Sequence, residues 1–188
     1  MSAATGLSRR QLLGASGAAG AATLAAGCGV LPAKTSTLQK IALTVDRPDV
    51  PILEGLLRHE YHLAYAYTAS LPRLNGYGLD AGRWFLRHEL GHIGAVSTLL
   101  KSGGVKPSTS AGAVRLGHPR NAREVLALLH RLEAEAIRAY LHAVAKLSNG
   151  QLRAVASAIL ANEGQHVSIL RRAQGLEPVP SALLSGNE

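Results

Sequence analysis

Cysteine and aromatic residues are scarce in this sequence. The chain has 188 residues, of which one is Cys, one is Trp and one is Phe, and aromatic residues make up 4% of it. The single cysteine, Cys28, excludes an intramolecular disulfide and an iron site with four cysteine ligands. Runs of β-branched residues are also scarce, and Ala and Leu are plentiful, so the composition favours helices over sheets. The net charge is +8, but no stripe of Lys and Arg alternates with aromatic residues, so no nucleic acid partner is predicted.

Residues 1–27 have the composition of an export signal. Arg9 and Arg10 precede an uncharged run from Gly14 to Gly27 that consists mostly of Ala and Gly. A positive region followed by a short, weakly apolar run is typical of a signal peptide and is too short for a membrane span. The segment Ser8-Arg9-Arg10-Gln11-Leu12-Leu13 resembles a twin-arginine signal, with an ordinary secretory signal as the alternative.

The cysteine follows directly after this segment. Ala25, Ala26 and Gly27 precede Cys28, and small residues before a cysteine resemble a bacterial lipoprotein processing site. This resemblance implies that Cys28 carries a lipid and that the protein is exported and anchored on the outer face of the cytoplasmic membrane. The alternative is cleavage near Ala26, which would leave a free thiol. Loss of residues 1–27 lowers the formal charge from +8 to +6, because it removes two arginines and no acid.

Helix signals divide the rest of the chain. Residues 28–50 are predicted to be a tether, 51–174 a helical domain and 175–188 a C-terminal tail. Within the domain we expect helices at 51–70, 80–102, 121–148 and 151–173, with Asp80 as the N-cap of the second and Asn121 at the start of the third, where Glu124 completes a capping box. The short connections 71–79 and 149–150 predict two antiparallel hairpins, and 103–120 is long enough to cross a bundle. The predicted fold is therefore an all-α four-helix bundle with one long crossover.

Two copies of the motif Glu-x-x-His lie on the second and fourth predicted helices. They are Glu89-Leu90-Gly91-His92 and Glu163-Gly164-Gln165-His166. Residues three apart project from the same face of a helix, so the glutamate and histidine of each motif can bind one metal ion.

The other two helices show a matching pattern. Glu60 precedes Glu89 by 29 residues, and Glu133 precedes Glu163 by 30. Each of these lone glutamates is followed seven residues later by a tyrosine, Tyr67 or Tyr140, which lies on the same helix face. Two similar hairpins would place both motifs and both lone glutamates at one level of the bundle.

These motifs resemble the ferritin-like di-iron carboxylate superfamily, and above all its rubrerythrin-like and desiccation-associated branches. The resemblance covers about residues 51–174 and implies six metal ligands: Glu60, Glu89, His92, Glu133, Glu163 and His166. Two nearby acids, Glu54 and Glu135, compete for the assignment. His88, His59 and His62 flank the ligands and are interpreted as surface residues or as residues that contact the ligands from outside.

The ligand set indicates redox chemistry. Carboxylates and imidazoles without thiolate suit iron or manganese, so we expect two Fe ions, with Mn as the alternative. Tyr67 and Tyr140 are catalytic candidates that could hydrogen-bond a ligand or supply an electron. The expected function is oxidation of Fe(II) or reduction of O2 or peroxide. The alternatives are dimanganese peroxide disproportionation and a metal-free, lipid-anchored interaction protein. The predicted partners are metal ions, O2 or peroxide and the membrane, and a homodimer is left open.

Overall fold

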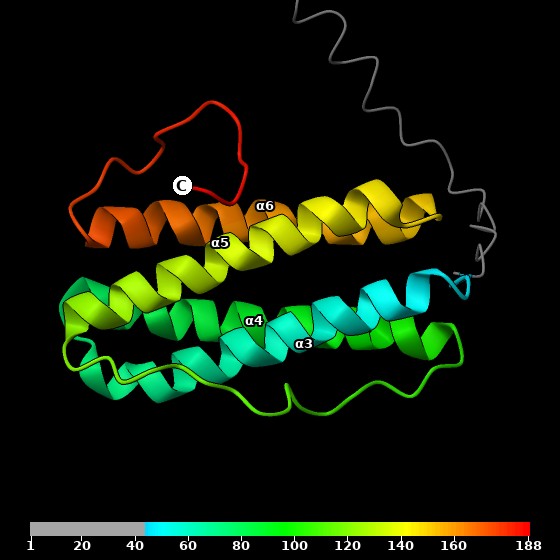
Figure 1. The fold of residues 1–188 in the computed structure, drawn as a ribbon, viewed down its shortest axis with the longest axis horizontal. Helices are drawn as coiled ribbons and strands as arrows, with labels where there is room; N and C mark the ends of the chain where they lie inside the picture. Colours follow the sequence, from blue (N-terminus) through cyan, green and yellow to red (C-terminus); the bar gives the residue numbers. More distant parts are fainter. Residues whose placement is uncertain (1–43) are drawn as a thin grey trace, which may run out of the picture. The chain divides into compact units, whose positions relative to one another are not determined.

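The computed structural model describes residues 44–188, and this part of the chain contains four α-helices and no strand (Figure 1). The helices, labelled as in Figure 1, are α3 (Asp49–Ser70), α4 (Gly76–Ser102), α5 (Ala122–Lys146) and α6 (Gly150–Ala173), and a short 3-10 helix, η1 (Leu71–Arg73), follows α3. Helices α3 and α4 form one antiparallel hairpin and α5 and α6 the other, while α3 also packs on α5 and α4 on α6. The long connection between α4 and α5 crosses the bundle. The predicted all-α four-helix fold is confirmed.

Several predictions fall on residues that the structure leaves out. The predicted export signal, Cys28 and the predicted tether as far as residue 43 lie outside the described residues. Within the described part of the chain, no helix is long and apolar enough to cross a membrane.

The first helix begins at Asp49, two residues before the predicted start. The side chain of Asp49 is buried, and its two oxygens accept hydrogen bonds from the backbone N–H (3.0 Å) and the hydroxyl (2.7 Å) of Ser148. These bonds join the start of α3 to the turn between α5 and α6. Residues 44–50, which were expected to belong to the tether, therefore include the first turn of the bundle.

The prediction that Asp80 caps the second helix was wrong. Helix α4 begins at Gly76 with Asn75 as its N-cap, and Asp80 lies inside the helix, 4.0 Å from Arg83. The backbone N–H of Leu79 already donates to the carbonyl of Asn75, and the side chain of Leu79 packs against the core. This packing outweighs the low helix propensity of two glycines in the first turn.

The other two helix starts are capped by asparagines. The side chain of Asn121 accepts the backbone N–H of Glu124, and that of Asn149 accepts the backbone N–H of Gln151. The side chain of Glu124 in turn accepts a hydrogen bond from the backbone N–H of Arg120. In a standard capping box it would accept from the N-cap residue, Asn121, so here the box is closed one residue earlier in the chain.

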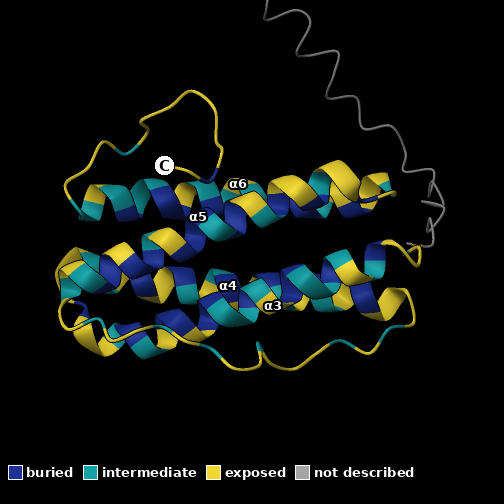
Figure 2. Cartoon of the chain, in the orientation of Figure 1, coloured by how far each residue is buried: buried dark blue, intermediate teal, exposed yellow. Residues whose placement is uncertain are grey.

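Apolar side chains fill both ends of the bundle. One cluster, which includes Leu63, Phe85 and Leu129, lies toward the end where α5 begins, and the other, which includes Leu53, Val96 and Leu152, lies toward the opposite end. Figure 2 shows that the buried residues follow the inward faces of all four helices. Burial of these side chains drives the helices together and leaves a polar level between the two clusters.

The tail from residue 175 folds back along α5 and α6 (Figure 1). Arg171 donates to the carbonyl oxygens of Glu177 (2.6 Å) and Glu188 (2.7 Å), and Arg138 donates to the carbonyl of Gly186. Leu184 lies on the outside of Gly164 in α6. The last residues of the chain are therefore held against the bundle.

Candidate metal centre

Six polar side chains meet at the polar level of the bundle. Each helix contributes at least one of them: Glu60 from α3, Glu89 and His92 from α4, Glu133 from α5, and Glu163 and His166 from α6. The four glutamates are 0% exposed, and the two histidines are 9% and 1% exposed. The structure thus brings all six predicted ligands to one place, as the repeated spacing of the two hairpins required.

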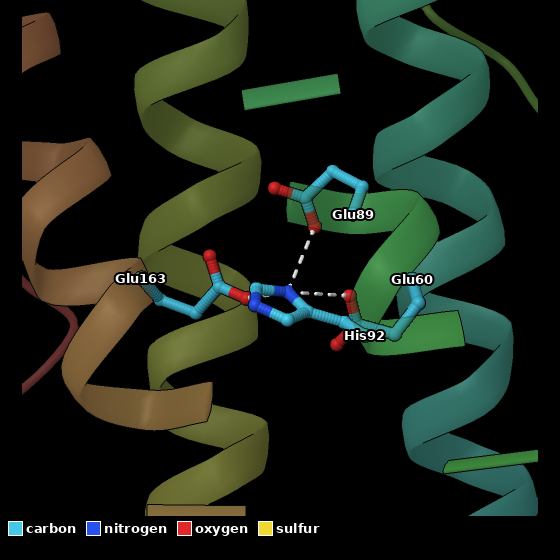
Figure 3. A group of neighbouring side chains, drawn as sticks. All are labelled: Glu60, Glu89, His92 and Glu163. Carbon is cyan, nitrogen blue, oxygen red and sulfur yellow. Dashed lines mark ion pairs between the residues drawn. The ribbon is translucent and has the colours of Figure 1, made fainter. Parts of the chain in front are cut away.

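The six residues form two groups, and the ligand atoms of each group lie within 4.8 Å of one another. The first group is shown in Figure 3. There, Nδ1 of His92 lies 3.4 Å from Glu60, 3.4 Å from Glu89 and 3.0 Å from Glu163.

The second group has the same plan. Nδ1 of His166 lies 3.2 Å from Glu89, 3.2 Å from Glu133 and 3.0 Å from Glu163. Glu89 and Glu163 belong to both groups and present a different oxygen to each histidine. They are therefore placed to bridge two ions, while Glu60 and Glu133 each serve one.

The atoms that face these two positions lack hydrogen-bond partners. Ten buried side-chain nitrogen or oxygen atoms in the described residues have none, and eight of them belong to the six residues of the two groups. Both oxygens of the two bridging glutamates and Nδ1 of both histidines are among the eight. Leaving buried polar atoms unpaired costs about 1–3 kcal/mol each. Two cations, each bound by carboxylate oxygens and one imidazole, would satisfy all of these atoms, so the residues present fit a dinuclear metal site.

Electrostatics favour cations at this level as well. Burial raises the pKa of Glu60 to about 8 and holds that of Glu133 well above its usual value. Burial would also raise the pKa of Glu163, but contacts with both histidines outweigh it and lower the value to about 2. Burial acts to lower the histidine pKa values, yet the surrounding carboxylates raise those of His92 and His166 to about 12. Without metal, protons on these groups balance the negative charge, and metal ions would displace them.

The two tyrosines lie beside the glutamates at the ends of the site. Tyr67 donates to Oε1 of Glu133, and Tyr140 donates to Oε1 of Glu60. Both rings are fully buried, and burial raises the pKa of both hydroxyls well above the usual value, so the tyrosines act as neutral donors. Each tyrosine therefore donates to the glutamate of the opposite helix, α5 for Tyr67 and α3 for Tyr140. The sequence spacing had placed each tyrosine on the same helix face as the glutamate of its own helix.

The outer nitrogens of the two histidines have different partners. Nε2 of His166 is 2.9 Å from Nδ1 of His88, and Nε2 of His92 is 3.1 Å from Oδ1 of Asn162. The ring of Phe85 stacks on His166 with the centroids 4.1 Å apart. The position of His88, one turn before His92 on α4, was a sequence signal for such a role. Nothing in the sequence marked Asn162 or Phe85.

The competing acids lie outside both groups. Neither Glu54 nor Glu135 belongs to them, and Glu135 is 3.9 Å from Arg131 near the surface. His59 and His62 line a separate cavity beneath the crossover. The ion pairs of the four central glutamates in the described part of the chain are all with His92 or His166.

Three solved structures share this architecture. A conserved hypothetical protein from Mycobacterium tuberculosis is 19% identical, with a TM-score of 0.64 over 67% of this chain and 96% of that one. A ferritin-like, di-iron carboxylate protein from Bacillus anthracis is 22% identical, with a TM-score of 0.59 over 67% and 94%. Bacterioferritin from Rhodobacter capsulatus, solved with a metal-free dinuclear site and haem iron, is 18% identical, with a TM-score of 0.62 over 70% and 86%. At these identities the likeness establishes the fold.

A family comparison goes further. No curated protein matches the chain. The family described as "Ferritin-like domain" matches residues 48–176, which include all four helices and all six residues of the two groups. The chain therefore belongs to the ferritin-like domain family.

Proposed function

We propose that this protein is an exported, lipid-anchored di-iron oxidoreductase that couples the oxidation of Fe(II) to the reduction of peroxide or O2. The observation that carries the proposal is the convergence of eight buried atoms without a hydrogen-bond partner on two positions that share Glu89 and Glu163. Shared carboxylates place the two positions next to each other, so two electrons become available at one place. When bound by the residues of the two groups, two Fe(II) ions would supply one electron each, and with two protons these electrons would convert one H2O2 to two waters or one O2 to H2O2.

The residues of the chain divide the work. Glu60 and Glu133 each serve one position, and carboxylates suit this role because they can change their mode of binding as the charge on a metal changes. The hydrogen bonds that Glu60 accepts from Tyr140 and Glu133 accepts from Tyr67 hold each carboxylate in place. His92 and His166 each contribute the one imidazole nitrogen of their group. The two apolar clusters toward the two ends of the bundle keep bulk water away from the polar level between them.

The metal-free alternative, an interaction protein, has less support. A scaffold would neutralise buried carboxylates with Lys or Arg, or replace them with apolar side chains. Here the ion pairs of the central glutamates, among the described residues, are with histidines alone, and both oxygens of Glu89 and of Glu163 make no hydrogen bond. No observation favours manganese over iron, so the dimanganese reaction is kept as an outcome of the test.

The location of the protein is proposed from the N-terminal sequence. The twin-arginine pattern at Arg9 and Arg10 and the small residues before Cys28 support export and lipid attachment. Export through the twin-arginine route would let the bundle fold and take up metal before it crosses the membrane. Replacing Cys28 by Ser should release the protein from the membrane fraction. Unchanged membrane association of the variant would refute the lipid anchor, and the proposal for the metal centre would not be affected.

The metal proposal is tested on the full chain, purified without chelators. Metal content is measured first, and Fe(II) is then titrated without oxygen before peroxide or air is admitted. We expect about two irons per chain and a rise in Fe(III) absorbance as the oxidant is consumed. Glu163→Ala should lose both ions, because the residue belongs to both groups, and Glu60→Ala should lose one.

Glu54→Ala is the matched control, since this acid lies on α3 outside both groups and should leave metal content unchanged. If the purified protein contains manganese and breaks down peroxide, the dimanganese reaction would replace the di-iron reaction as the proposed function. No bound metal, with no change in thermal stability on adding Fe(II) or Mn(II), would refute both metal-dependent functions.

A further inference from the structure

A second candidate site lies outside the metal centre. The last part of the crossover, residues 114–120, passes the end of α3 and the 3-10 helix η1 and encloses a cavity of about 740 Å³ with them. Figure 1 shows the crossover running along α3 to the start of α5. None of the six residues of the metal centre lines this cavity. The kind of ligand that this cavity can bind therefore follows from the residues that line it.

That lining is strongly basic. Arg73, Arg115 and Arg120 all contribute to it, together with His118, and no Asp or Glu does. Arg120 is already engaged, because it lies 3.1 Å from Glu124. The side chain of Arg73 donates one hydrogen bond within the described residues, to the backbone carbonyl of Ala69 at 3.4 Å, and neither Arg73 nor Arg115 takes part in an ion pair there. Two guanidinium groups are thus available to an anion.

Most of the other side chains that line the cavity are apolar. Val114, Leu116 and Pro119 come from the crossover, and the ring of Tyr65, 52% exposed, comes from α3. The volume falls in the range of about 300–1,000 Å³ that is usual for sites of small organic ligands, and it is far larger than an inorganic anion needs. The cavity therefore suits a ligand with one anionic group and an apolar or aromatic body.

We propose that this cavity binds the phosphate group of an organic ligand through Arg73 and Arg115, with the rest of the ligand against Leu116 and Tyr65. A guanidinium group presents two parallel N–H donors that match two phosphate oxygens, and two such groups match a doubly charged anion better than a monocarboxylate. A soluble organic phosphate and a membrane phospholipid headgroup share this chemistry. The site is independent of the metal centre and of the redox function proposed above.

The first experiment uses inorganic phosphate as the probe and the full, metal-free chain as the protein. Binding is followed at constant ionic strength by calorimetry and by the NMR shifts of the amides of Leu116 and Gly117. We expect saturable binding to the original protein and a loss of about tenfold or more in affinity for R73Q/R115Q. The control R83Q/R172Q removes the same charge from exposed positions outside the cavity and should bind like the original protein. An unchanged circular dichroism spectrum and unfolding midpoint show that each variant is folded.

A second arm distinguishes the two sources of the phosphate group. Vesicles of phosphatidylglycerol and of phosphatidylcholine are offered to the same proteins, and the bound fraction is measured by sedimentation. Binding to phosphatidylglycerol that R73Q/R115Q loses and the control keeps identifies a lipid headgroup. Phosphate binding with the same pattern, but without vesicle binding, identifies a soluble ligand. Phosphate that fails to saturate the protein, or equal losses in the two double variants, would overturn the site.

Discussion

The hydroxyl of Tyr67 on α3 donates a hydrogen bond to Oε1 of Glu133 on α5. The reverse bond, from Tyr140 on α5 to Glu60 on α3, lies at the other end of the metal centre. The two bonds therefore join the two hairpins across the middle of the bundle. They also give Glu60 and Glu133, the two glutamates that belong to one group each, a neutral hydrogen-bond donor. A buried carboxylate needs such a donor whether or not metal is bound.

Removing either hydroxyl should destabilise the metal-free protein. In Tyr67→Phe, Oε1 of Glu133 loses the donor that the structure gives it, and an unpaired buried acceptor costs about 1–3 kcal/mol. The change is measured by chemical denaturation of the metal-free protein. Tyr65→Phe is the control, because this hydroxyl belongs to a half-exposed ring, and its effect should stay within about 0.5 kcal/mol. Equal effects of the two substitutions would mean that the bond to Glu133 contributes nothing.

Metal should weaken the dependence of stability on pH that the metal-free protein shows. The pKa of Glu60 is raised to about 8 from 4.5, so the folded metal-free chain holds a proton that the unfolded chain releases above about pH 4.5. For His92 and His166, raised to about 12 from 6.5, the stabilising contribution is complete below 6.5 and is lost as the pH rises toward 12. The metal-free protein should therefore lose about 1 kcal/mol or more for each pH unit above 7.

Metal ions displace these protons, so a rise in pH should strengthen metal binding and offset this loss. The test is chemical denaturation of the metal-free and the Mn(II)-loaded protein between pH 7 and 8.5, without oxygen. We expect the gap in stability between the two forms to widen with pH. A metal-free protein that becomes more stable over this range would contradict the protonation described for the site.

The partner of His166 should matter for metal affinity. His88 fixes the ring of His166 from outside, and loss of such a partner typically weakens metal binding about 10–100-fold. His88→Leu should show this loss in a titration with Co(II), whereas His88→Asn, which offers an amide as Asn162 does to His92, should recover part of it. His142→Leu, an exposed histidine elsewhere on α5, is the control. Affinity of His88→Leu equal to that of the control would show that His88 has no influence on the site.

The bundle was predictable because its signals are local. Helix periodicity and the Asn121 cap act within a few residues, and the length of residues 103–120 directly sets the distance that this connection can span. The convergence of the six polar residues followed from the near-equal spacing of 29 and 30 residues within the hairpins. The error at Asp80 arose because tertiary packing of Leu79 extended α4 beyond a good capping residue.

The features that could not be predicted from the sequence are contacts between side chains of different helices, which depend on how the helices pack. Spacing places Tyr67 on the face of Glu60, but the angle between α3 and α5 decides that its hydroxyl reaches Glu133. The contact of Asn162 with His92 and the return of the tail onto α6 have the same origin, since no periodic pattern encodes them.

The tail gives a prediction that separates backbone strain from steric fit. Gly186 has a φ of +82°, and a Cβ added there would lie 2.5 Å from Cγ of Arg138 and 2.6 Å from the carbonyl oxygen of Ala134. Gly112 in the crossover has a similar φ of +77°, but an added Cβ would meet nothing within 4 Å. Both Gly→Ala changes carry the cost of a left-handed backbone, about 1–2 kcal/mol, and the change at Gly186 adds a collision with α5.

Gly186→Ala should therefore detach the end of the tail, whereas Gly112→Ala should not. Hydrogen exchange measures this directly, since the amides of residues 177–188 should exchange faster in Gly186→Ala while those of α4 keep their protection. The bonds of Arg171 to Glu177 and Glu188 are expected to weaken together, because one side chain holds both ends of the returning segment. Equal tail exchange in the two variants would mean that the contact with Arg138 and Ala134 does not hold the tail in place.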